Sequence, residues 1–254
     1  MSDAIPLRTE LLDKVVQRVD RLQSQQQFDY GAVRYRLILE ALTLGVQYVY
    51  NNAVEGDIAE FGTGSGFSSF IIARAMAAYH ELLAVHLQRH GMSEGKTLHL
   101  FDSFRGLPKP EDPIDLGSPY VQAGRWQEGT FAGLTEDEVG ALCASAYDRK
   151  RILVYAGWFK DSLKTLSPKT RFAMVHLDCD LHSSTFEVLD FLFSRRLLAE
   201  GAALFFDDWN CNRSSPRFGQ RRAWSDVTRK RRVEFSDCGD YAVLGHKFIV
   251  HGAG

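Results

Sequence analysis

Five short apolar segments alternate with segments of helical spacing between residues 57 and 229, and this alternation constrains the fold more than any other feature of the chain. The apolar segments cover residues 57–61, 97–101, 151–156, 172–177 and 202–206. Helices are expected over residues 68–90, 161–166, 184–198 and 220–229. Short apolar strands that alternate with helices predict a parallel sheet with both faces covered.

The two ends of the chain depart from this alternation. Residues 233–250 predict two strands with a bend near 241–244 and no helix between them, which is typical of an antiparallel hairpin. Helical spacing also predicts two helices before the first strand, over residues 8–27 and 34–50. We therefore expect a doubly wound, mostly parallel α/β domain over residues 53–254, preceded by an N-terminal helical extension over residues 1–52.

Composition excludes several classes of partner. The 254 residues carry a net charge of -2, so neither a nucleic-acid nor a membrane partner is expected. No segment approaches the roughly 20 apolar residues that span a bilayer. The N-terminus lacks the basic start and apolar core of a signal peptide, and the four cysteines are scattered without a CxxC pair. These features predict reduced thiols and a cytoplasmic location. A basic cluster at 217–232 indicates either a solvated helix face or a site for an anionic substrate.

The first predicted strand ends in a glycine-rich turn. Gly62, Gly64 and Gly66 alternate with other residues in a G-x-G-x-G pattern, so the backbone can turn tightly and approach a ligand. The helix that follows offers unpaired N–H groups to an anion, such as the carboxylate of a methionine moiety. A purely structural glycine turn is the alternative. The candidate cofactor-binding residues in this region are Glu60, Gly62, Thr63, Gly64 and Ser68.

The second and third strands also end in candidate cofactor-binding residues. Asp102, followed by Ser103 and Phe104, is placed to accept hydrogen bonds from ribose hydroxyls, although it could instead cap a short helix. Gly157 and Trp158 follow the third strand, where an aromatic pair with Phe159 could wall an adenine or the substrate, or pack in the core.

Carboxylates follow the fourth and fifth strands. Asp178 and Asp180 end one strand, and Asp207 and Asp208 end the next. Like charges this close resist ionisation unless a cation neutralises them, and carboxylate oxygens suit Mg²⁺, Mn²⁺ or Ca²⁺. Asp207 and Asp208 alone could cap a following helix. Two such clusters on neighbouring strands favour a divalent metal site.

Four segments together resemble one family of enzymes. The patterns DSFRGLP at 102–108, EGTF at 128–131, DCDLHSST at 178–185 and DDW at 207–209 are similar to those of macrocin O-methyltransferases, which act on sugars of antibiotics. The resemblance implies Mg²⁺-dependent methyl transfer from S-adenosylmethionine to a sugar hydroxyl of a natural product, in a homo-oligomer such as a homodimer. It also implies the Rossmann-like class I methyltransferase fold, with which the C-terminal hairpin agrees.

The resemblance also implies roles for individual residues. Asp178, Asp207 and Asp208 match the metal ligands of the family, and Asp178 is counted among the cofactor-binding residues as well. Asp180 matches the second acid of the motif and is a candidate general base, while residues 128–139 correspond to a mobile loop over the site. His182, where the family often has Tyr, is a competing candidate base or simply the polar start of a helix.

Three other functions compete with methyl transfer. A metal-dependent hydrolase or nucleotide-sugar enzyme could use the same aspartates, but it would not require the glycine turn together with Asp102. A non-catalytic cofactor-binding relative would not need all four aspartates. A nicotinamide oxidoreductase is disfavoured because its glycine spacing is G-x-G-x-x-G and because of the hairpin. Methyl transfer to a small-molecule acceptor is therefore the expected function.

Overall fold

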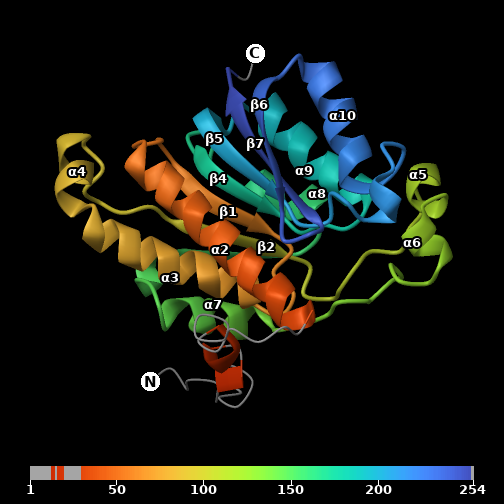
Figure 1. The fold of residues 1–254 in the computed structure, drawn as a ribbon, viewed down its shortest axis with the longest axis horizontal. Helices are drawn as coiled ribbons and strands as arrows, with labels where there is room; N and C mark the ends of the chain where they lie inside the picture. The colour runs from red at the N-terminus through yellow and green to blue at the C-terminus, as the bar shows by residue number, and fades with distance from the viewer. Residues whose placement is uncertain (1–12, 15, 20–29, 253–254) are drawn as a thin grey trace.

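The computed structural model describes residues 13–14, 16–19 and 30–252, and its centre is a seven-stranded sheet in the order β3-β2-β1-β4-β5-β7-β6 (Figure 1). The strands are β1 (Asp57–Phe61), β2 (Leu98–Asp102), β3 (Ile152–Ala156), β4 (Phe172–Leu177), β5 (Leu198–Phe206), β6 (Glu234–Tyr241) and β7 (Gly245–His251). Strands β1 to β5 are parallel, and β7 pairs antiparallel with both β5 and β6. The predicted α/β fold with its C-terminal hairpin is confirmed.

Helices cover both faces of the sheet (Figure 1). On one face lie α2 (Tyr30–Asn51), α3 (Phe67–Leu82), α4 (Ala84–Arg89) and α7 (Glu136–Ala144). On the other lie α8 (Phe159–Ser162), α9 (His182–Ser194) and α10 (Gly219–Arg231). The short helices α5 (Pro113–Leu116) and α6 (Pro119–Gln122) project to the side, each with a proline in its first turn, where the missing N–H is tolerated. Within the described residues, 3₁₀ turns cover 149–151, 163–165 and 212–214.

Helix α2 packs directly against the sheet. Leu42, Val46 and Val49 of α2 are completely buried in one core cluster together with residues of α3 and the sheet. Gly45 permits this close approach, because a Cβ atom there would lie 2.6 Å from Cζ of Phe205 on β5. The described part of the segment that we expected to be an extension therefore shares its core with the sheet, and the domain boundary at residue 52 stays a prediction.

The opposite face is rich in aromatic side chains. The Trp224 ring of α10 stacks on Phe248 of β7 with centroids 4.6 Å apart, and both rings belong to a second buried cluster with residues of α9. Aromatic side chains bury large areas, so this cluster anchors α10 to the hairpin end of the sheet. The hairpin thus completes the core on this side, where a dinucleotide fold would place another helix.

Several predicted boundaries differ from the structure. The helix expected over 68–90 is two helices, because the chain leaves helical geometry at Leu83 between α3 and α4. The helix expected over 161–166 is α8 followed by a 3₁₀ turn. The helix expected over 184–198 ends at Ser194, and β5 begins at Leu198 instead of residue 202. The first expected helix, 8–27, lies mostly outside the described residues; residues 13–14 and 16–19 are helical.

The strand order positions the site. The chain runs outward from β1 to β3 on one side and from β4 onward on the other, so the order reverses between β1 and β4. Ligands of doubly wound folds bind beyond the carboxyl ends of the strands at such a switch point. The glycine turn after β1 and the acidic motif after β4 lie at this point.

Candidate active site

A cavity of about 1180 Å³ opens at the carboxyl ends of the parallel strands. The predicted site residues that line it are Gly62, Thr63, Gly64, Ser68, Asp102, Ser103, Gly157, Trp158, Asp178, Asp180, Asp207 and Asp208. Glu60, Phe104 and His182 were also expected there but do not line it. The structure therefore brings most of the expected cofactor residues and all three expected metal ligands into one cavity.

The glycine turn brings the backbones of β1 and β4 together. Gly62 has a φ of 90°, and a Cβ atom there would lie 2.0 Å from the carbonyl oxygen of Asp178. Only glycine fits such a position without displacing the acidic motif. Gly66 takes a left-handed conformation immediately before α3, whose first N–H groups therefore begin at the cavity.

Asp102 holds the glycine turn in place. Its Oδ2 atom accepts hydrogen bonds from the N–H groups of Thr63 at 2.7 Å and Gly64 at 3.2 Å. Its Oδ1 atom accepts one from the N–H of Phe104 at 2.7 Å. No helix begins between 103 and 112, so Asp102 is not the helix cap that the sequence left open. Its binding of ribose stays a prediction.

Glu60 lies beneath the glycine turn, completely buried. It accepts a hydrogen bond from the hydroxyl of Ser69, and its Oε1 atom is 2.9 Å from Nδ1 of His176 on β4. Burial lowers the pKa of His176, but the hydrogen bond and charge of Glu60 outweigh it, so the net shift is upward. Glu60 thus links the end of β1 to Ser69 of α3 and to His176 of β4. Phe104 is partly buried against the core cluster that contains α2 and α3 residues and does not line the cavity.

Three aspartates converge where β4 and β5 end. Oxygen atoms of Asp178, Asp207 and Asp208 all lie within 4.8 Å of one another. Burial, and then the charges of Asp207 and Asp208, raise the pKa of Asp178 well above its usual range. Burial and Asp207 raise the pKa of Asp208 to about 6. Oδ1 of Asp207 is buried without a hydrogen-bond partner. An all-oxygen set with an unpartnered carboxylate oxygen fits a hard dication such as Mg²⁺.

Arg34 of α2 reaches this cluster, and sequence reasoning missed it. Its Nη2 atom lies 2.8 Å from Oδ2 of Asp207. Burial lowers the pKa of Arg34, but the charges of the three aspartates outweigh it, so its pKa is raised. The available signal was an arginine near the start of an otherwise largely apolar helix. Its partner stands 173 positions further along the chain, so spacing alone could not identify the pair.

A buried glutamine on α10 joins the ends of β4 and β5. The side-chain oxygen of Gln220 accepts a hydrogen bond from the N–H of Asp208 at 2.9 Å, and its amide nitrogen donates to the Leu177 carbonyl at 2.9 Å. The N–H of Asp180 in turn donates to Oδ2 of Asp208 at 3.2 Å. Gln220 therefore positions the backbone that carries the acidic cluster, a role that the sequence did not indicate.

Two loop segments form a roof over the cavity, which we define as residues 103–108 and 127–134. They pair through their backbones, because Leu107 donates to Thr130 and Gly129 donates to Leu107, each at 2.9 Å. The roof rests on the glycine turn, where the N–H of Leu134 donates to the Gly64 carbonyl at 2.9 Å. A Cβ atom on Gly133 would lie 1.9 Å from the same Gly64 oxygen. The DSFRGLP and EGTF motifs are thus two halves of one structure.

A family model described as Macrocin-O-methyltransferase (TylF) matches residues 15–234, which include the sheet, the roof and both acidic motifs. This chain belongs to the macrocin O-methyltransferase family. The match confirms the resemblance on which the predicted enzyme class rested, namely that of an O-methyltransferase.

A curated relative of this macrocin O-methyltransferase family member is, by its name, an O-methyltransferase of a tetracenomycin. The chain is 29% identical over 188 residues, or 71% of its length, to 8-demethyl-8-(2,3-dimethoxy-alpha-L-rhamnosyl)-tetracenomycin-C 4'-O-methyltransferase from Streptomyces olivaceus. The match spans 65% of that relative's length.

Two solved structures share the fold of this family member. The O-methyltransferase NovP is 18% identical, with a TM-score of 0.67 over 96% of this chain and 99% of that one. An O-methyltransferase from Bacillus cereus in complex with SAH is 17% identical, with a TM-score of 0.51 over 99% of this chain and 94% of that one.

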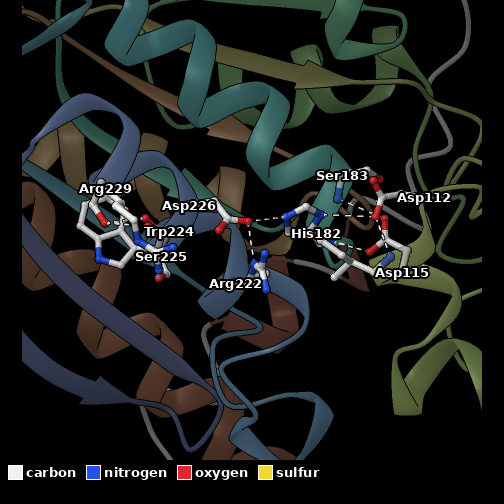
Figure 2. Close-up of polar contacts among 11 residues, drawn as sticks. Asp112, Asp115, His182, Ser183, Arg222, Trp224, Ser225, Asp226 and Arg229 are labelled. Atoms are coloured by element: carbon white, nitrogen blue, oxygen red, sulfur yellow. Dashed lines mark hydrogen bonds and ion pairs between the residues drawn. The ribbon is translucent and has the colours of Figure 1, made fainter.

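His182, the competing candidate base, is the first residue of α9 in this family member. Its side chain lies beside the cavity, with Nε2 3.3 Å from Oδ2 of Asp226 on α10 (Figure 2). Its backbone N–H donates to Oδ1 of Asp115 at 2.7 Å. Asp180 lines the cavity and His182 does not, and a role of either residue in proton transfer stays a prediction.

The aromatic pair after β3 combines the two functions that the sequence left open. Trp158 and Phe159 both line the cavity. The Phe159 ring also packs edge-on against Phe61, with centroids 5.7 Å apart. Phe159 of this family member therefore packs in the core and also lines the cavity.

The basic cluster lies away from the cavity of this family member. No residue of 217–232 lines the cavity. Arg222 pairs with Asp226 at 2.7 Å, and Arg231 pairs with Asp190 of α9 at 2.8 Å. Of the two interpretations of the basic cluster, these contacts support a solvated helix face and not an anion-binding site in the cavity. In the described residues, no helix is both long and apolar enough to cross a membrane.

Proposed function

We propose that this chain transfers a methyl group from S-adenosylmethionine to a hydroxyl group of a small-molecule acceptor, with Mg²⁺ held by Asp178, Asp207 and Asp208. One observation carries the proposal: the glycine turn with Asp102 and the three-aspartate cluster open into the same cavity. A donor held at the turn and an acceptor held at the cluster would therefore meet. Family membership supports the same reaction.

The donor would bind along the glycine turn. The first N–H groups of α3, from Phe67 onward, would face an anion such as the methionine carboxylate. Oδ1 of Asp102 accepts the N–H of Phe104, while the turn occupies Oδ2, so the remaining lone pair of Oδ1 would accept a hydrogen bond from a ribose hydroxyl. Trp158 would provide an apolar wall for the adenine. The Bacillus cereus structure carries SAH, the product that remains after S-adenosylmethionine gives up its methyl group.

The acceptor would lie against the aspartates. Mg²⁺ bound there would supply a charge that lowers the pKa of a coordinated hydroxyl. The chain contributes the three carboxylates, the Arg34 charge that holds one oxygen of Asp207, and the Gln220 bridge that fixes the strand ends. These residues would orient the acceptor oxygen, and orientation of two reactants supplies several kcal/mol towards catalysis.

The reaction exchanges one bond for another. The acceptor oxygen attacks the methyl carbon, an O–C bond forms, and the C–S bond breaks, leaving S-adenosylhomocysteine. The hydroxyl proton goes to the carboxylate of Asp180, which lines the cavity and is linked to Asp208 through its N–H. His182 lies outside the cavity lining, so we assign it no proton-transfer role.

We propose a sugar of a glycosylated natural product as the acceptor class. The supporting observation is the name of the Streptomyces olivaceus relative, a methyltransferase of a rhamnosyl-tetracenomycin. Vicinal hydroxyls of a sugar can bind a metal ion as a chelate, which suits the three-aspartate cluster. A homo-oligomeric state, such as a homodimer, and a cytoplasmic location stay predictions.

The test is a calorimetric titration of S-adenosylmethionine into the protein, with EDTA and with Mg²⁺, on wild type and Asp207→Asn. The proposal expects donor binding in both proteins and a Mg²⁺ site that only wild type retains. An exposed carboxylate offers a matched control, Asp161→Asn, which should keep both. Absence of donor binding would return attention to a metal-dependent hydrolase or nucleotide-sugar enzyme. Donor binding without methyl transfer to any hydroxyl acceptor would favour a non-catalytic relative.

A further inference from the structure

A second group of possible metal ligands lies beside the cavity, outside the machinery described above. Asp112, Asp115 and His182 each offer a ligand atom, and these atoms lie within 4.8 Å of one another. Asp112 and Asp115 stand at the start of α5 and within it, whereas His182 is the first residue of α9. Figure 2 shows the imidazole of His182 between these two aspartates on one side and Asp226 on the other.

One ring nitrogen of His182, Nδ1, has no hydrogen-bond partner and is directed towards the two aspartates (Figure 2). Only 7% of the His182 side chain is exposed, and the Nδ1 atom is buried. The nearest carboxylate oxygen is Oδ1 of Asp112, at 3.7 Å, which is beyond hydrogen-bond length. A buried polar atom without a partner destabilises the folded state, so its presence requires an explanation. A metal ion between Nδ1 and the carboxylates would satisfy it.

The other ring nitrogen has the partner that a metal-binding histidine needs. Nε2 of His182 lies 3.3 Å from Oδ2 of Asp226, and Arg222 donates to the same oxygen at 2.7 Å. A metal-ligating histidine usually donates its second ring N–H to a carboxylate, which fixes the tautomer and leaves the first nitrogen free to bind. The pair Asp226 and His182 has this arrangement with Nδ1 as the free nitrogen.

Asp112 and Asp115 both have oxygen lone pairs that remain available to a metal ion. Asp115 is 1% exposed, and its oxygens accept the N–H groups of His182 at 2.7 Å and Ser183 at 3.1 Å. Asp112 accepts the N–H of Ile114 at 2.8 Å. A carboxylate has about four lone-pair sites, so each still has free ones. Three carboxylates surround His182, with Arg222 as a counter-charge, and a dication would reduce the remaining negative charge.

We propose that Asp112, Asp115 and His182 bind a transition-metal dication of the Zn²⁺ type. One imidazole nitrogen with two carboxylates suits Zn²⁺, whereas the all-oxygen set of Asp178, Asp207 and Asp208 suits Mg²⁺. Ligands of a tetrahedral Zn²⁺ site lie about 3.3 Å apart at bond lengths near 2.0 Å, so small side-chain movements close the group. The ion would join α5 to the start of α9 beside the cavity. The proposal does not depend on methyl transfer.

The test is a calorimetric titration of Zn²⁺ into metal-free full-length protein in millimolar Mg²⁺, which occupies the all-oxygen cluster. Wild type and Asp207→Asn should each bind one Zn²⁺. Asp112→Asn and His182→Gln should bind it at least tenfold more weakly. Asp226→Asn should weaken it about 10–100-fold through the histidine. Asn at 112 can still accept the N–H of Ile114, so α5 keeps its cap, and circular dichroism checks that each variant folds.

Controls separate this site from its surroundings. Glu111→Gln removes an adjacent exposed acid and should leave Zn²⁺ affinity within twofold of wild type. Co²⁺ in place of Zn²⁺ should give visible absorption bands that disappear in His182→Gln. The proposal is overturned if wild type binds no Zn²⁺ in Mg²⁺, if the folded Asp112→Asn protein binds as wild type does, or if Asp207→Asn is the variant that loses Zn²⁺.

Discussion

The guanidinium of Arg34 on α2 lies 2.8 Å from the carboxylate of Asp207 at the end of β5. Through this pair, a helix that precedes the sheet supplies positive charge to the acidic cluster. Removing one partner of a buried ion pair leaves the other charge uncompensated.

We expect Arg34→Met to lower the free energy of unfolding in EDTA by about 2 kcal/mol, since a partly exposed pair costs less to break than a fully buried one. Saturating Mg²⁺ should restore part of this loss, because it compensates Asp207. Urea unfolding in EDTA and in Mg²⁺ measures both. Arg36→Met, which breaks an exposed pair with Glu40 on the same helix, should cost less than about 0.5 kcal/mol. Equal losses in the two variants would contradict the role of Arg34.

Gly133→Ala should separate the roof from the glycine turn. The added Cβ would lie 1.9 Å from the Gly64 oxygen, so one of the two backbones must move. Because the turn carries the proposed donor site, we expect the Kd for S-adenosylmethionine to rise at least tenfold, or about 1.4 kcal/mol.

The matched control for the roof is Gly140→Ala on α7. The added Cβ there would lie 3.4 Å from a side-chain methyl of Val154, an ordinary contact, so donor affinity should stay within twofold of wild type. Calorimetric titration of S-adenosylmethionine compares the two variants. Unchanged affinity in a folded Gly133→Ala protein would show that the roof does not shape the donor site.

Gln220→Met should weaken the ends of β4 and β5 together. It leaves the N–H of Asp208 without a partner and removes one of two donors to the Leu177 carbonyl, which keeps the N–H of Asp207 at 3.0 Å. A buried unpaired group costs about 1–3 kcal/mol. We expect a loss of about 2 kcal/mol in urea unfolding and a Mg²⁺ affinity at least tenfold weaker. Gln88→Met makes the same substitution at an exposed position on α4 and should change neither. Unaltered Mg²⁺ affinity in Gln220→Met would mean that the cluster keeps its geometry without the bridge.

Lys96 should make stability depend on pH. Burial lowers the pKa of Lys96 to about 8, and its Nζ atom donates to the carbonyls of Val54 and Gly56. The folded pKa is below the unfolded value of 10.5, so the unfolded state binds more protons between these values and stability rises with pH. From pH 7 to pH 9.5 the contribution is about 2 kcal/mol.

Urea unfolding of wild type and Lys96→Met at the two pH values isolates this effect. Lys96→Met should be less stable overall, because two carbonyls lose their donor, but its stability should lack the 2 kcal/mol rise. Parallel pH profiles for the two proteins would contradict a lowered pKa. Burial raises the pKa values of nearby Tyr50 and Tyr147, which keeps both hydroxyls protonated in this window.

The strands could be predicted because burial on both faces leaves a continuous apolar pattern that spacing alone reveals. Strand β4, for example, is buried along its whole length. Helix ends were harder, because leucines near 197–198 suit either a helix or a strand, and only pairing with β4 assigns Leu198 to β5. Asp178, Asp207 and Asp208 could be placed together because parallel strands end at the same edge.

The residues that the sequence did not reveal act through long-range contacts. Arg34 and Gln220 reach the acidic cluster from helices far away in the chain, and neither belongs to a motif. Glu60 was expected at the cofactor because it lies close to the end of β1. Side chains alternate along a strand, however, and its carboxylate contacts His176 and Ser69. Which way a strand-end residue points depends on packing, which spacing does not encode.

Asp115 of α5 accepts the first two N–H groups of α9, a helix that carries no side-chain cap of its own. The helix that follows the DCD motif is therefore completed by a residue 67 positions earlier. Chimeras that exchange residues 108–126 between relatives, as one would build to change acceptor preference, would remove this cap unless the donor sequence supplies an equivalent acid. Grafts of this loop should accordingly be chosen by the residue that they place at position 115 before their fit to a new acceptor is considered.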